Sequence, residues 1–113
     1  MSEFTFLFRG RDTSASPEQM QKTMEKWVAW MKDLGAKGHI KDQGHPLELT
    51  GKVVRGKQKI VNDGPYAEAK DVVGGYMVIE AKDLAHAAEL SKGCPILEVE
   101  GSVEVRPIQK LNM

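Results

Sequence analysis

The sequence lacks most of the features that would place it in a specialised class of protein. It has one cysteine, Cys94, in 113 residues, so no internal disulfide can form and a reducing compartment is the simplest inference. No apolar run approaches the ~20 residues that a membrane-spanning helix needs. The N-terminus also lacks the basic head and apolar run of a signal peptide. We therefore expect a cytoplasmic protein that does not enter a membrane.

An excess of charge of either sign is also missing. Sixteen basic residues balance sixteen acidic ones, and no basic stripe stands out. This argues against direct binding to nucleic acid, where affinity rests on contacts to phosphates. No two of the three histidines have metal-ligand spacing, and no cysteine joins them. No phosphate-binding loop, dinucleotide fingerprint or serine triad is present. We predict no metal site and no cofactor.

What is present is typical of a single domain over residues 1–113, with 41% hydrophobic and 28% charged residues. Phe4, Phe6 and Phe8 alternate with other residues and predict a strand that ends at Gly10. Ser16 begins a helix, because Pro17 suits the first helical position and Gln19 lies three residues after Ser16, as in a capping box. An apolar stripe predicts the core face of this helix, with Trp30 at its edge: Met20, Met24, Trp27, Val28, Met31 and Leu34.

The middle of the chain predicts a loop and a hairpin. Residues 41–46 are polar and form the loop, while 47–55 and 58–62 predict two partly exposed strands around a two-residue Gly56-Lys57 turn. A tight turn at Asp63-Gly64-Pro65 follows.

The C-terminal part predicts a strand over 75–81, a second helix and a last strand over 103–106. Asp83 caps the helix, and Gly93 and Pro95 stop it. Its predicted inward side chains are Leu84, Ala87, Ala88 and Ser91.

The order of strand, long helix, hairpin, strand, helix and strand predicts an α+β fold, in which two helices cover one face of an antiparallel sheet. The other face would be left open. Because a large exposed apolar face is costly, we expect a second copy to cover it in a symmetric homodimer.

Several motifs occur together in a fixed order: Phe8-Arg9-Gly10, a Ser-Pro-Glu helix with two tryptophans, Asp63 through Lys70, Gly74-Gly75-Tyr76, Gly93-Cys94-Pro95 and 103–107. With these motifs the chain resembles the YCII-related family, in particular its DGPF branch, over nearly its whole length. Tyr66 stands where that branch has phenylalanine. The resemblance implies a ferredoxin-like fold that dimerises sheet to sheet as a dimeric α/β barrel. It also implies a cleft between helix and sheet near the Asp63-Gly64-Pro65 turn.

Asp63 is the leading candidate for a catalytic group. A carboxylate held at a turn beside a cleft could act as a general base; alternatively, Asp63 forms an Asx-turn with its own backbone. His45, in a polar loop, has a side chain that titrates near neutral pH and is the second catalytic candidate, unless it is simply exposed. No histidine of this chain aligns with the His–Asp pair proposed to be catalytic in some YCII-like proteins.

Six further residues are candidates for ligand binding: Arg9, Trp30, Tyr66, Glu68, Lys70 and Tyr76. Arg9 either reaches an anionic ligand or pairs with an acid across the sheet. Glu68 and Lys70 flank a polar ligand or form a solvated surface pair. Trp30, like Trp27, lines a pocket or belongs to the core.

Two functional hypotheses follow. In the first, the dimer binds and converts a small polar or aromatic metabolite by acid–base chemistry without a cofactor. In the second, the chain is a non-enzymatic interaction module. The resemblance supplies the reason for the second, because relatives occur beside or fused to extracytoplasmic-function sigma factors, and balanced charge suits a protein partner.

Overall fold

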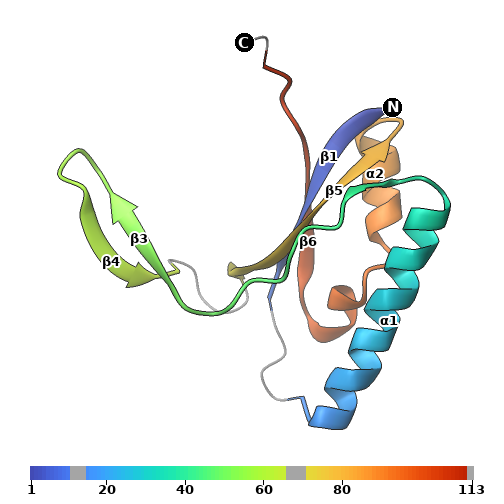
Figure 1. The fold of residues 1–113 in the computed structure, drawn as a ribbon, viewed down its shortest axis with the longest axis horizontal. Coiled ribbons are helices and arrows are strands. Elements are labelled where there is room, and N and C mark those ends of the chain that lie inside the picture. Colours follow the sequence, from blue (N-terminus) through green and yellow to red (C-terminus); the bar gives the residue numbers. More distant parts are fainter. Residues whose placement is uncertain (11–14, 66–70, 112–113) are drawn as a thin grey trace.

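The architecture is a four-stranded antiparallel sheet with two helices on one face and a separate hairpin (Figure 1). It is seen in a computed structural model that describes residues 1–10, 15–65 and 71–111. The sheet order is β2-β5-β1-β6, formed by Ile40–Asp42, Val73–Ala81, Ser2–Arg9 and Ser102–Pro107. This is the ferredoxin-like order, so the predicted α+β fold is confirmed, while dimerisation sheet to sheet stays a prediction.

Buried and more exposed side chains alternate strictly along β1 and β5, so the sheet has one buried face and one open face. Phe4, Phe6 and Phe8 of β1 are buried, as are Met77 and Ile79 of β5. The register places Phe4 opposite Ile79 and Phe6 opposite Met77, so the buried side chains of both strands meet on one face. The core lies between this face and the helices.

The long helix α1, Pro17–Ala36, begins as the sequence predicts. Ser16 accepts a hydrogen bond from Gln19 N at 3.2 Å, and Gln19 Oε1 accepts one from Ser16 N at 2.9 Å. These two bonds satisfy backbone donors that the first turn of a helix leaves free. Lys37 caps the other end, and Gly38 follows with φ 77°.

The predicted core stripe of α1 is wrong at three of its positions. Met20, Met24 and Val28 are 60%, 63% and 45% exposed, whereas Trp30 and Leu34 are buried. The first half of α1 therefore carries apolar side chains that the described residues of this chain do not cover.

The second helix α2, Leu84–Ser91, is capped by Asp83, whose side chain accepts from His86 N at 2.8 Å. Ala87 and Ser91 face inward as predicted, but Leu84 is 47% exposed and Ala88 is also exposed. The 3-10 helix η2, Pro95–Val99, follows and was not predicted.

The region between α1 and β5 differs most from the sequence prediction. Strand β2 lies partly within the predicted loop 41–46. The hairpin strands β3, Gly51–Arg55, and β4, Ile60–Gly64, form a sheet of their own. A four-residue turn, closed by Lys59 N donating to Gly56 O at 3.1 Å, replaces the predicted two-residue turn. The predicted turn at Asp63-Gly64-Pro65 is also wrong, because Asp63 and Gly64 belong to β4.

Candidate functional site

A cleft of about 870 Å³ lies between the first half of α1 and the sheet. We call it the α1 cleft. Its apolar walls come from Phe8, Met20, Met24, Trp27, Met31 and Met77. The Phe8 and Trp27 rings meet edge to face, with centroids 4.9 Å apart and planes at 89°. Ligand sites are commonly clefts of this size with mainly apolar and aromatic walls.

Few of the described residues that line the α1 cleft carry ionisable side chains. Lys26 and Glu98 both line it, but they bind each other, with Lys26 Nζ 3.2 Å from Glu98 Oε2. Lys22, His45 and Tyr76 also line it. Of these side chains, the imidazole of His45 can both donate and accept a hydrogen bond at its ring nitrogens.

Residues 43–46 run along the edge of β5, and this contact fixes the position of His45. Pro46 pairs with Gly75, Leu47 N donates to Gly74 O at 2.8 Å, and Tyr76 N donates to the His45 carbonyl. The His45 and Tyr76 rings lie 6.2 Å apart, centroid to centroid. Because Tyr76 alternates with buried Gly75 and Met77, its side chain belongs to the open face of the sheet, opposite the face that borders the α1 cleft.

Gly44 makes this close approach feasible. Its φ is +65°, a left-handed conformation that favours glycine. A Cβ at this position would overlap the carbonyl oxygen of Tyr76. The backbone that carries His45 can therefore lie this close to β5 only without a side chain at residue 44.

Asp63 lies outside the α1 cleft. It is on β4, its side chain is 89% exposed, and it forms an ion pair with Lys52 across the hairpin. The structure therefore does not bring Asp63 and His45 together within one chain.

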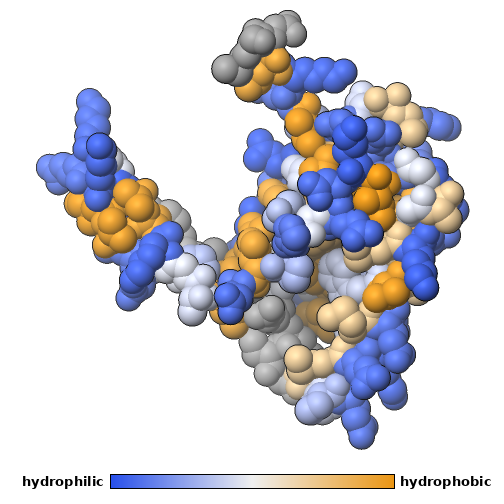
Figure 2. Space-filling model, in the orientation of Figure 1, coloured by the Kyte–Doolittle hydropathy of each residue, from blue (hydrophilic) through white to orange (hydrophobic). Residues whose placement is uncertain are grey.

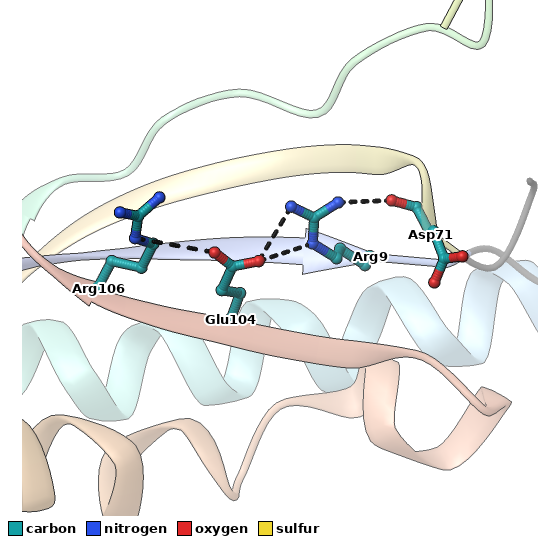
Figure 3. A network of polar contacts seen from close by, with 4 residues as sticks. All are labelled: Arg9, Asp71, Glu104 and Arg106. Carbon is teal, nitrogen blue, oxygen red and sulfur yellow. Dashed lines mark hydrogen bonds and ion pairs between the residues drawn. The ribbon is translucent and has the colours of Figure 1, made fainter. Parts of the chain in front are cut away.

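Arg9 faces the open side of the sheet (Figure 3). Its Nε and Nη2 both lie 3.0 Å from Oε1 of Glu104 on the neighbouring strand, and Nη1 donates to the Asp71 carbonyl at 2.6 Å. Arg106 Nε lies 3.8 Å from the other oxygen of Glu104. Of the two roles that the sequence left open, the structure shows pairing with an acid across the sheet.

The structure gives the two tryptophans different roles, which the sequence left open. Trp30 is 9% exposed, stacks on Phe6 with centroids 6.1 Å apart, and donates from Nε1 to the Leu90 carbonyl at 3.4 Å. It is a core residue. Trp27 is half-buried and lines the α1 cleft. The candidates Tyr66, Glu68 and Lys70 lie outside the described residues.

Cys94, His39 and His86 do not line the α1 cleft. Burial raises the pKa of the Cys94 thiol from 9.0 to about 12, against a smaller lowering by the Ile96 backbone. His39 and His86 contact each other, with ring centroids 5.2 Å apart. In the part of the chain that the structure describes, no three His, Cys, Asp or Glu side chains could together hold a metal ion.

The YCII-related domain matches residues 3–112, which is nearly the whole chain. The chain belongs to the YCII-related family. This confirms the family assigned from sequence, while the narrower DGPF assignment stays a prediction. A search of curated proteins found no significant match to this YCII-related chain. No helix among the described residues is long and apolar enough to cross a membrane.

One solved structure similar to this YCII-related chain is 5-chloro-2-hydroxyhydroquinone dehydrochlorinase from Burkholderia phenoliruptrix AC1100, in complex with 2,5-dihydroxybenzoquinone. The two are 15% identical, with 95% of this chain and 93% of that chain covered and a TM-score of 0.47. A likeness this distant has no bearing on the activity of the present chain.

Proposed function

We propose that the chain binds a small aromatic metabolite in the α1 cleft and that His45 exchanges a proton with a polar group of that ligand. The observation that carries this proposal is the composition of the cleft, in which apolar and aromatic walls are bordered by the segment that carries His45. The proposal keeps the cofactor-free acid–base chemistry expected from the sequence, with His45 rather than Asp63 as the leading group.

The walls favour a flat, apolar ring. Met20 and Met24 are more than half exposed although both line the cleft. Each buried Å² of apolar surface is worth about 25 cal/mol, so covering these side chains with a ligand would stabilise the complex. Methionine thioethers also make favourable contacts with aromatic rings, and Trp27 offers a further ring surface.

His45 suits proton exchange because its ring is accessible. The residue is exposed, and no described side chain or backbone group hydrogen-bonds to its ring nitrogens. It can therefore accept a proton from a ligand hydroxyl or return one without first breaking a bond. A phenol-like ligand would supply both the ring and the hydroxyl.

The test uses 4-nitrophenol as a probe, because its phenolate absorbs visible light and reports the protonation of the bound molecule. Binding is followed by quenching of tryptophan fluorescence. We expect Trp27→Phe to lower the affinity for the probe, because it removes part of the cleft's ring surface, and His45→Gln to weaken binding and shift the pH at which the bound probe ionises.

His39→Gln is the matched control, because His39 lies outside the cleft and bonds the Glu80 carbonyl through Nδ1 at 2.9 Å. It should leave probe affinity and ionisation unchanged. Equal effects of the His39 and His45 variants, or an unchanged affinity in Trp27→Phe, would reject the proposal.

A further inference from the structure

Helix α1 contributes two kinds of side chain to the wall of the α1 cleft. Beside the methionines and the tryptophan lie four polar residues, which we call the polar row: Gln19, Lys22, Thr23 and Lys26. They come from successive turns of the helix, so they follow one another along its side. Figure 2 shows both hydrophilic and apolar side chains, blue and pale orange, along this half of α1. The polar groups in a mainly apolar cleft decide which ligand it selects.

The free end of the Gln19 side chain is a hydrogen-bond donor. Gln19 Oε1 accepts from the Ser16 backbone N–H at 2.9 Å, as part of the capping box. The other end of the amide, Nε2, donates two hydrogen bonds and accepts none. No described group accepts a hydrogen bond from it. The capping box therefore leaves the amide with donors to offer a ligand.

Thr23 supplies a second donor. It lies one turn after Gln19 and one turn before Trp27, on the same side of the helix. The residue is half-buried, and no described group hydrogen-bonds to its hydroxyl. A hydroxyl with reduced access to water gains by bonding a ligand. A polar group of a ligand whose ring contacts Trp27 would therefore be close to Thr23.

The charges in the described wall of the cleft do not cancel. Lys26 Nζ lies 3.3 and 3.2 Å from the two carboxylate oxygens of Glu98, so these two charges compensate each other. Lys22 is exposed, and no described acid lies within ion-pair distance of it. With His45 neutral, two lysines against one glutamate leave the described wall with a net charge of +1. A ligand with one negative charge would balance it.

We propose that the aromatic ligand of the α1 cleft carries a carboxylate, which the ammonium of Lys22, the hydroxyl of Thr23 and the amide nitrogen of Gln19 bind. This inference rests on the proposed function, because it needs a ring in the cleft, and it adds the chemical class of that ring. An ionised carboxylate only accepts hydrogen bonds, and its two oxygens can accept several at once. It is therefore matched by a row that offers donors and one uncompensated positive charge.

Other polar groups fit the polar row less well. A carboxamide would present N–H donors, and neither Lys22 nor the free end of Gln19 has an acceptor for them. A phosphate ester carries between one and two negative charges at neutral pH, which exceeds the net charge of the described wall. A carboxylate carries one.

The test compares 4-hydroxybenzoate with 4-hydroxybenzamide, which share the ring and the hydroxyl and differ in charge. Titration calorimetry of the full chain at neutral pH and low salt measures both dissociation constants. We expect 4-hydroxybenzoate to bind at least about tenfold more tightly, because hydrogen bonds to an ionised acceptor are the stronger ones. Added salt should reduce this difference, since Lys22 is exposed.

Substitutions in the polar row locate the carboxylate. Lys22→Gln and Thr23→Val should each lower the affinity for 4-hydroxybenzoate more than the affinity for 4-hydroxybenzamide, and Lys22→Gln should do so by at least about threefold. Lys32→Gln is the matched control, because Lys32 is also an exposed lysine of α1 without a described ion-pair partner but does not line the cleft. It makes the same change in net charge and should leave both affinities within about twofold of the wild type.

The outcomes separate this inference from the proposed function. Equal affinity for the two probes would overturn the carboxylate assignment and leave the aromatic cleft standing. A Lys32→Gln variant that loses as much as Lys22→Gln would also overturn it, since the attraction would then come from overall charge. If neither these probes nor 4-nitrophenol binds, the proposed function fails and this inference fails with it.

Discussion

The rings of His45 and Tyr76 lie 6.2 Å apart with their planes at 66°, and the same two residues share a backbone hydrogen bond of 3.4 Å from Tyr76 N to His45 O. The position of His45 is therefore set by the backbone of residues 43–46 against β5. Changes to that backbone should alter ligand binding even where no cleft side chain is changed.

Gly44→Ala should weaken binding of 4-nitrophenol. A Cβ at residue 44 would overlap the Tyr76 carbonyl, so the segment carrying His45 must move away from β5. Gly38→Ala is the control, because Gly38 also has positive φ, at +77°, but an added Cβ there meets nothing within 4 Å. Each substitution should cost about 1 kcal/mol for the left-handed backbone, and only Gly44→Ala should also reduce probe affinity. Equal affinities in the two variants would contradict this account of residues 43–46.

Trp30→Ala should destabilise the fold by about 3–5 kcal/mol, since it leaves a cavity beside Phe6 in the core. Trp27→Ala should cost less, about 1–2 kcal/mol, because Trp27 is half-buried at the cleft. Urea unfolding measures both. The assignment of Trp30 to the core fails if Trp27→Ala proves the more destabilising of the two.

Glu104→Gln should change the unfolding free energy by no more than about 1 kcal/mol at concentrations where the chain is monomeric. The Glu104 and Arg9 side chains are 39% and 30% exposed, and solvent screens such pairs. Urea unfolding of the wild type and of Glu104→Gln measures the difference, and a loss of several kcal/mol would be inconsistent with a solvent-screened pair.

Cys94 should resist alkylation by iodoacetamide at pH 8 in the folded protein and react once urea unfolds it. Burial raises its pKa from 9.0 to about 12, so the folded thiol stays protonated where the unfolded thiol ionises. Between these two pKa values the unfolded state binds fewer protons, so this group's stabilisation, full below pH 9, is lost as the pH rises toward 12. Cys94→Ala should make the free energy of unfolding depend less on pH in this range. Rapid labelling of the native protein would show that the thiol is not buried.

Local signals predicted much of the fold. The Ser16 capping box, the Asp83 cap and the alternation of Phe4, Phe6 and Phe8 each depend on neighbours close in sequence. Strand β2 was missed because three residues in a polar stretch have no periodicity, and their pairing with β5 is a long-range contact.

The site was harder to predict. The apolar stripe of α1 has the same period whether it faces a core or a cleft, so sequence could not separate Trp27 from Trp30. Likewise, Asp-Gly-Pro is typical of a turn, but cross-strand pairing of Lys52 with Asp63 extends β4 through Gly64. Residues 43–46 gave one signal that could have been used: Gly44, which lies directly before His45.

The central claim, that the α1 cleft holds a small aromatic ligand, is tested most directly by the methionine methyl resonances of the ¹³C-labelled protein during titration with 4-nitrophenol. Four of the five methionines in the described part of the chain line the cleft, namely Met20, Met24, Met31 and Met77, and Met1 serves as the internal control. The account predicts saturable shifts for the four cleft methyls, reduced in His45→Gln, with Met1 unchanged. Shifts of equal size in Met1 and the cleft methyls, or none at saturating probe, would contradict it.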